Sequence, residues 1–133
     1  MQKKEKGSNK LLIVEDERDL LEAMKFDLEL SGFEVATAGD GAEGLRIARQ
    51  IMPDLVILDL LLPKVDGYRV CRMLKVDPRT AGIPVLMLTA KSTSEDERMG
   101  KQSGADLYMT KPFDPEILRE KIQMLVGNGK KGE

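Results

Sequence analysis

Five short apolar runs alternate with five helical patterns along this chain, and this alternation constrains the fold more than any other feature. The first, third and fourth runs are almost continuously apolar, which is typical of strands covered on both faces of a parallel sheet. The run Phe33–Ala38 is less apolar and is expected at or near an edge of the sheet. The expected strands are Lys10–Glu15, Phe33–Ala38, Asp54–Asp59, Ile83–Thr89 and Ala105–Thr110.

Amphipathic stretches separate and follow these runs, and several have recognisable ends. Asp40 and Asp114 are expected N-caps, and Pro115 suits the first position of the last helix. Gly104 and Gly127 fit C-terminal caps. Strict β-α alternation predicts an α/β fold, a doubly wound five-stranded parallel sheet with helices on both faces. The expected helices are Arg18–Leu30, Asp40–Gln50, Val65–Val76, Thr93–Ser103 and Asp114–Val126.

Composition excludes several functional classes. The chain has 133 residues, enough for one domain with its own core, and a net charge of −2 that gives no attraction to nucleic acid or anionic membranes. No apolar run reaches the ~20 residues that span a bilayer, and the basic residues 1–10 lack the apolar stretch of a signal peptide. The single cysteine, Cys71, cannot form an intrachain disulfide and fits a reducing cytosol, so a cytoplasmic location is expected.

Polar side chains stand at the ends of four of the five expected strands. The first strand ends in Glu15-Asp16, the third in Asp59 and the fourth in Thr89, and Lys111 follows the fifth. Ligands bind beyond the carboxyl ends of the strands in open α/β sheets. Each residue alone could be an ordinary loop or strand residue, but together they place three carboxylates, one hydroxyl and one ammonium at one edge.

Such a cluster limits the chemistry that the site can perform. Histidine is absent from the chain, so any reaction must use carboxylates, hydroxyls and lysine. Three carboxylates held together repel one another and call for a divalent cation, and hard oxygen ligands suit Mg²⁺. Mg²⁺ and Lys111 would neutralise an anionic phosphodonor, which would leave Asp59 free to attack in line. The residues therefore favour phosphorylation of an aspartate.

The same positions carry a specific family resemblance. Over most of Asn9–Leu125, the sequence resembles the receiver domain of two-component response regulators, of which the single-domain chemotaxis regulator is the familiar example. Four motifs in order carry the resemblance: Glu15-Asp16, LDLLLPKVDG around Asp59, LTA at 88–90 and TKPF at 110–113. Pro63 and Asp66-Gly67 fall at the family's spacing after Asp59.

The resemblance implies a role for each matching residue. Asp59 is the phosphoacceptor, Lys111 contacts the phosphoryl group, and Pro112 follows a cis peptide bond. The metal ligands are Asp16, Asp59 and the backbone carbonyl of Leu61, and Glu15 acts partly through water; its replacement of the commoner Asp is conservative. Thr89 and Tyr108 form the switch, and Leu61 and Lys91 modulate dephosphorylation by standing over the approach of water.

The resemblance also implies a fold order, partners and a mode of action. The strand order is 2-1-3-4-5, as in flavodoxin-like folds, and the cofactor is Mg²⁺. The phosphodonor is a histidine kinase or a histidine phosphotransfer protein. A downstream effector binds the face formed by 93–103, 105–110 and 114–126, where a phosphorylation-dependent homodimer is a further expectation; neither nucleic acid nor membrane is expected to bind directly. The protein is expected to be a regulator with self-catalysed phosphotransfer and weak autodephosphorylation, not a conventional enzyme.

The expected domain layout is an arm over 1–9, a receiver domain over 10–127, and a tail or linker start over 128–133. Four other functions fit the sequence less well. An FMN-binding flavodoxin needs a hydroxyl- or glycine-rich phosphate loop where this chain has the acidic EDERD, and a haloacid-dehalogenase-type phosphatase needs a second Asp where Leu61 stands. A nucleotide hydrolase needs a P-loop, which is absent. A degenerate receiver acting as a constitutive binding module is disfavoured because the site residues are intact. The sequence leaves open whether the regulator stands alone or begins a longer chain.

Overall fold

The computed structural model describes residues 9–90, 98–99 and 101–131, and it contains the expected parallel sheet. Its five strands lie in the order β2-β1-β3-β4-β5, and every neighbouring pair is parallel. The less apolar second strand is at an edge, as predicted. The strands are β1 (Lys10–Val14), β2 (Glu34–Ala38), β3 (Leu55–Asp59), β4 (Val85–Thr89) and β5 (Leu107–Thr110).

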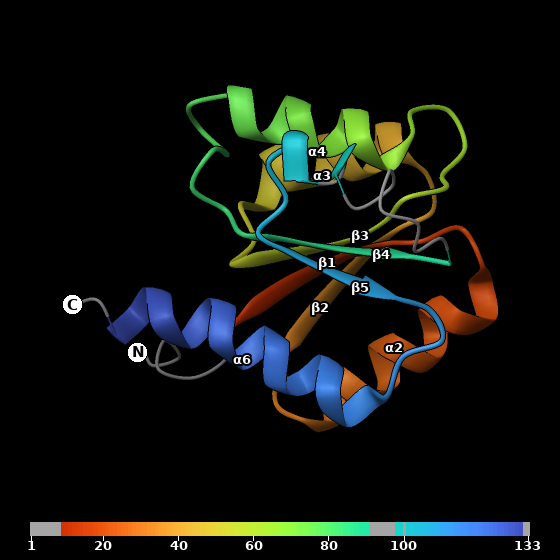
Figure 1. Ribbon diagram of the computed structural model, residues 1–133. Helices are drawn as coiled ribbons and strands as arrows, with labels where there is room; N and C mark the ends of the chain where they lie inside the picture. Colours follow the sequence, from red (N-terminus) through yellow and green to blue (C-terminus); the bar gives the residue numbers. More distant parts are fainter. Residues whose placement is uncertain (1–8, 91–97, 100, 132–133) are drawn as a thin grey trace.

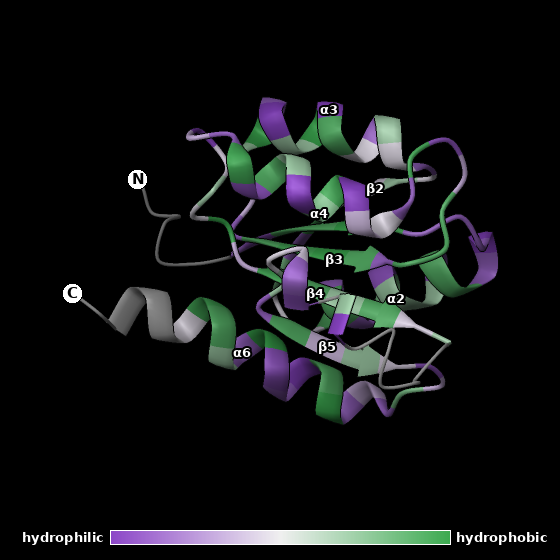
Figure 2. Cartoon of the chain, turned by 45° about the horizontal axis from the view of Figure 1, so that its top comes forward, coloured by the Kyte–Doolittle hydropathy of each residue, from purple (hydrophilic) through white to green (hydrophobic). Residues whose placement is uncertain are grey.

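Helices cover both faces of this sheet (Figure 1). The helices α3 (Gly41–Ile51) and α4 (Gly67–Val76) pack on one face, and α2 (Arg18–Leu30) and α6 (Pro115–Lys131) pack on the other. Strands β3 and β4 are buried along their whole length, because side chains that alternate between the faces enter one hydrophobic core or the other. Figure 2 shows the result as predominantly green central strands between helices that carry purple outer turns. The doubly wound α/β prediction is confirmed.

The helix starts follow the sequence signals. The Asp40 carboxylate accepts a hydrogen bond from the Glu43 amide at 2.8 Å, and Asp114 accepts one from the Glu116 amide at 2.8 Å. Both aspartates therefore satisfy backbone donors that a helix leaves unpaired at its first turn. None of the helices in the described part of the chain is long and apolar enough to cross a membrane.

The predicted end of the last helix is wrong. Helix α6 continues past Gly127 to Lys131, so Gly127 is not its C-terminal cap. A glycine weakens a helix interior by about 1 kcal/mol but need not end a helix, and this helix is anchored shortly before that point by the buried Ile122 and Val126. Gly104 does have the positive φ, 96°, that a C-cap glycine requires. Most of the helix predicted over 93–103 lies outside the described residues, as do residues 1–8 of the predicted arm.

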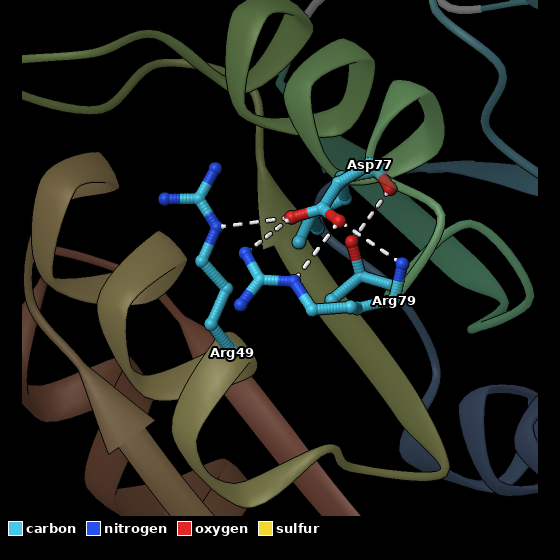
Figure 3. Close-up of polar contacts among 5 residues, drawn as sticks. Arg49, Asp77 and Arg79 are labelled. Carbon is cyan, nitrogen blue, oxygen red and sulfur yellow. Dashed lines mark hydrogen bonds and ion pairs between the residues drawn. The ribbon is translucent and has the colours of Figure 1, made fainter.

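A cluster of charged side chains joins α3 to the turn after α4, at the end of the sheet where the strands begin (Figure 3). The Asp77 carboxylate accepts hydrogen bonds from the Arg79 amide at 3.0 Å and the Arg79 guanidinium at 2.9 Å, and it lies 3.5 Å from Arg49 of α3. The hydrogen bonds from Arg79 lower the pKa of Asp77 to about 2. The charge therefore stays on Asp77 at all ordinary pH values and holds this turn.

At the other end of the sheet, where the strands finish, two glycines let backbone segments approach closely. A Cβ on Gly41 would overlap the carbonyl of Val65, and a Cβ on Gly67 would overlap the carbonyl of Asp59. The amide of Gly67 instead donates a hydrogen bond to the Leu60 carbonyl at 2.8 Å. The loop that follows Asp59 is thus packed against the first residues of both α3 and α4.

This packing predicts that Gly41→Ala destabilises the protein by about 1–3 kcal/mol, the usual range for overpacking. The added methyl group has only backbone atoms and the buried Val70 in front of it, and these cannot move aside freely. Gly82→Ala is the matched control, since a Cβ there would meet nothing within 4 Å. Urea unfolding of both variants checks the expectation. Equal free energies of unfolding for the two variants would contradict it.

Candidate functional site

The polar residues singled out in the sequence meet at one edge of the sheet. Strands β1, β3, β4 and β5 all end there because they are parallel, and Asp59 and Thr89 are the last residues of β3 and β4. In the register, Asp59 pairs with Leu88, and Thr89 pairs with Thr110. The polar residues at the ends of these strands therefore lie at the same end of the sheet.

An ion-pair bridge joins three of these residues. The Lys111 ammonium lies 3.0 Å from a carboxylate oxygen of Glu15 and 3.3 Å from one of Asp59. Glu15 is 2% exposed and Asp59 is 5% exposed, so both carboxylates are held away from water. The single cation of Lys111 therefore offsets two buried negative charges that would otherwise repel each other.

The acidic side of the site can accept a metal ion. One oxygen from each of Glu15, Asp16 and Asp59 lies within 4.8 Å of the others. The second oxygen of Glu15 accepts the Glu17 amide at 3.1 Å, which fixes the Glu15 carboxylate in place. Asp16 is exposed and open to an incoming cation. Three oxygen ligands of this kind form a set that suits a hard divalent cation.

The surroundings of the bridge shift the pKa of Asp59 and the pKa of Lys111. Removal from water and the nearby negative charge of Glu15 raise the pKa of Asp59 to about 6, even though Lys111 acts in the opposite direction. Burial also opposes the charge of Lys111, but the hydrogen bond to Glu15 and the attraction to Asp59 outweigh this effect and raise the pKa of its ammonium group. Near neutral pH, the site therefore contains an ionised but poorly solvated carboxylate beside a firmly charged lysine.

The two residues expected to form a switch lie on one face of the sheet. Tyr108 is half-buried and packs against the core beneath α3 and α4, directly beside Met87 in the register. Thr89 is fully buried two residues after Met87, so its side chain points to the same face. The Thr89 hydroxyl at the site and the Tyr108 ring on the neighbouring strand therefore lie on the same face of the sheet.

Two further predicted residues, Pro112 and Leu61, lie close in sequence to the site residues. The Lys111–Pro112 peptide bond is cis. The Leu61 side chain, in the loop two residues after Asp59, is 57% exposed. Lys91 lies outside the described residues.

Sequence reasoning missed an apolar groove beside the site. The groove encloses about 470 Å³ between α2 and the segment that follows Lys111. Its apolar wall comes mainly from residues four apart on α2 and from the residues after the lysine: Leu20, Met24, Pro112, Phe113 and Leu118. The helical spacing of Leu20 and Met24 was visible in the sequence, but it indicated only a core-facing stripe. Nothing in the spacing showed that part of this stripe would stay open.

Comparison with curated proteins gives related regulators. The chain is 46% identical over 117 residues to the DNA-binding dual master transcriptional regulator RpaA of Synechocystis, a match that covers 88% of this chain and 48% of that protein. It is 41% identical over 119 residues to the alkaline phosphatase synthesis transcriptional regulatory protein PhoP of Bacillus subtilis, covering 90% of this chain and 49% of that protein. The chain therefore spans about half the length of these relatives.

Solved structures give the same result for the fold. A receiver domain of a signal transduction histidine kinase from Syntrophus aciditrophicus superposes with a TM-score of 0.88 at 36% identity, covering 95% of this chain and 96% of that one. A CheY-like response regulator receiver domain protein from Methanospirillum hungatei superposes with a TM-score of 0.87 at 30% identity, covering 95% and 99%.

The response regulator receiver domain family matches residues 11–123. This segment contains the whole acidic site and all five strands, apart from Lys10, the first residue of β1. The match spans most of the chain and agrees with the relatives, the solved structures and the site geometry. This chain belongs to the response regulator receiver domain family.

Proposed function

We propose that this receiver domain works as a phosphorylation-dependent switch whose phosphoacceptor is Asp59. The observation that carries the proposal is the position of Asp59, which is buried at a strand end within 3.3 Å of the Lys111 ammonium and beside the acidic pair Glu15-Asp16. A histidine kinase is the partner that receiver domains imply, and a histidine phosphotransfer protein is the alternative donor. In the reaction, an Asp59 oxygen bonds to phosphorus as the phosphorus–nitrogen bond of phosphohistidine breaks, and the imidazole takes up a proton.

The acidic cluster supports Mg²⁺ as the cofactor. Asp16, Asp59 and the backbone carbonyl of Leu61 would hold the ion, and Glu15 would act partly through water. When bound, Mg²⁺ supplies positive charge that draws the phosphodonor's oxygens toward the site. Lys111 contributes a second positive charge from the protein itself, and its contact with Asp59 keeps the carboxylate oriented. In this proposal the domain catalyses its own phosphorylation and a slow hydrolysis of the product.

Thr89 and Tyr108 would carry the signal away from Asp59. A phosphoryl group on Asp59 gives the buried Thr89 hydroxyl a new acceptor, and an inward shift of Thr89 frees space for Tyr108 on the same face. The surface that changes would include β5, α6 and the preceding helical residues 98–99 and 101–102. A bias of a few kcal/mol between two existing states is enough for such a switch.

The relatives bear on what this surface controls. Their names describe DNA-binding and transcriptional regulators about twice as long as this chain. We infer that residues 10–127 form the receiver unit and that its output acts through a partner or a further domain. The sequence-based expectation that no nucleic acid binds directly has no support from these relatives, so it is not part of the proposal. The groove beside Lys111 would give a phosphodonor protein an apolar surface next to Asp59.

The first prediction from this proposal concerns the acceptor. Incubation with acetyl phosphate and Mg²⁺ should add one phosphoryl group to the wild-type protein, as read by intact mass, and EDTA should abolish the addition. Asp59→Asn should remove it because the nucleophile is lost. Asp54→Asn, at the residue just before β3, is the matched control and should be labelled like the wild type. Labelling of Asp59→Asn at the wild-type rate would contradict the assignment.

The second prediction concerns pH. Because the folded protein raises the pKa of Asp59 from 3.8 to about 6, the folded state holds a proton that the unfolded chain releases between these values. Stability should therefore fall as pH rises through this window, by roughly 3 kcal/mol for the shift. Asp59→Asn avoids the charge, so in EDTA it should be more stable than the wild type at pH 8 by roughly 2–3 kcal/mol, with little difference at pH 4.

Urea unfolding at the two pH values measures this difference directly. Mg²⁺ should shrink the advantage of Asp59→Asn at pH 8, because a bound cation offsets the charge that burial disfavours. An equal advantage at pH 4 and pH 8 would show that ionisation of Asp59 is not its cause.

The third prediction concerns the lifetime of the phosphorylated state. Hydrolysis needs a water in line with phosphorus. In this proposal the Leu61 side chain stands over the approach of that water and cannot hydrogen-bond it. Leu61→Asn should accelerate decay of the phosphorylated protein several-fold in Mg²⁺. Leu30→Asn changes a similarly exposed leucine on α2 and should leave the decay unchanged. If Leu61→Asn decays at the wild-type rate, exclusion of water by Leu61 does not set the lifetime; Lys91→Glu then tests the other flanking position.

A further inference from the structure

Two helix faces on opposite sides of the sheet present apolar side chains to solvent. On α2, Phe26 is 67% exposed and Leu30 is 73% exposed. On α4, Met73 is 41% exposed and Val76 is 72% exposed. Helices α2 and α4 cover opposite faces of the sheet (Figure 1), so the two patches lie on opposite sides of the molecule. Neither patch belongs to the phosphorylation site.

The charges around these patches are opposite in sign. Helix α2 contains four acidic and two basic residues, a net charge of −2. Helix α4 contains three basic residues and no acidic one, a net charge of +3. Arg69 and Arg72 of α4 are exposed, and within the described chain no ion pair engages either guanidinium. The α4 patch therefore has positive charge available for an acidic partner.

The order of side chains along each helix also corresponds. Residues four apart form a ridge on a helix surface, and Glu22, Phe26 and Leu30 form such a ridge on α2, with the acid at its N-terminal end. Helix α4 has two such ridges, Arg69 with Met73 and Arg72 with Val76. In both, the charged residue is at the N-terminal end. If the two helices lie roughly parallel, the α2 ridge fits between the α4 ridges. Glu22 then meets the arginines, and Phe26 and Leu30 meet Met73 and Val76.

We propose that the α2 outer face (Glu22, Phe26 and Leu30) binds the α4 outer face (Arg69, Arg72, Met73 and Val76) of a second copy of this chain. The two faces differ, so the contact is heterologous, and a bound pair of copies still has one free α2 face and one free α4 face for further copies. Association therefore builds a chain or closed ring of receiver domains and requires no phosphoryl group.

An ion pair within each copy competes with the proposed contact and limits its strength. Glu22 lies 4.0 Å from Arg18, an exposed pair of the kind that contributes little stability, so Glu22 can exchange this partner for an arginine of another copy. Lys25 pairs with Glu29 at 3.2 Å and leaves the ridge clear. The charged part of the contact is solvent-exposed, so added salt should weaken the association.

Sedimentation velocity of the whole chain, from micromolar to millimolar concentration and without a phosphodonor, tests the proposal. The sedimentation coefficient should rise with concentration and fall with added salt. Phe26→Glu and Val76→Glu should each raise the concentration for half-association about tenfold or more, because each replaces a buried apolar contact with a charge. Both positions are exposed, so neither variant should impair folding. Met124→Glu, at a similarly exposed apolar residue of α6, is the matched control and should associate like the wild type.

Mixing the two interfering variants gives the sharpest outcome. An equimolar mixture of Phe26→Glu and Val76→Glu retains one intact α4 face and one intact α2 face, so it should form a dimer and nothing larger. A wild type that stays monomeric throughout the range would overturn the proposal. Loss of association in only one of the variants, or a mixture that stays monomeric, would also overturn it, since a heterologous contact requires both faces.

Discussion

The structure of the site depends on the bridge that Lys111 makes to two buried carboxylates. Burying an unpaired carboxylate costs several kcal/mol, and Glu15 and Asp59 lie close together with almost no access to water. The contacts of 3.0 and 3.3 Å to one ammonium group offset this cost only in part, which agrees with the raised pKa of Asp59. The fold thus holds Asp59 in a state that gains from any further positive charge, which is the state a phosphoacceptor with a metal cofactor requires.

The rest of the fold keeps this arrangement in position. Strands β1 and β3 are buried on both sides, so the residues at their ends have little freedom to move. The loop after Asp59 is packed against the first residues of α3 and α4, where only glycine fits at positions 41 and 67. At the other edge of the sheet, the charged cluster around Asp77 joins α3 to the end of α4. The site is therefore supported by elements that have no part in its chemistry.

Much of this could be predicted from the sequence, because apolar runs and the polar residues that end them are local features. The runs ending at Asp59 and Thr89 fixed two of the site positions directly, and parallel strands then required them to meet. Other features depend on tertiary packing. The last helix continues through Gly127 because Ile122 and Val126 are anchored in the core. The groove beside Lys111 stays open because the segment after Pro112 leaves Leu20 partly exposed. The strong pKa shift of Asp59 likewise required the geometry.

The most direct test of this account is a crystal structure with Mg²⁺ and beryllofluoride, which mimics a phosphoryl group. The adduct should form on an Asp59 oxygen, with the metal ion held by Asp16 and Asp59, Lys111 in contact with the adduct, and Thr89 turned toward it. An adduct on a different carboxylate would contradict the account. So would a site in which Lys111 remains on Glu15 and Asp59 alone while a bound adduct lies out of its reach.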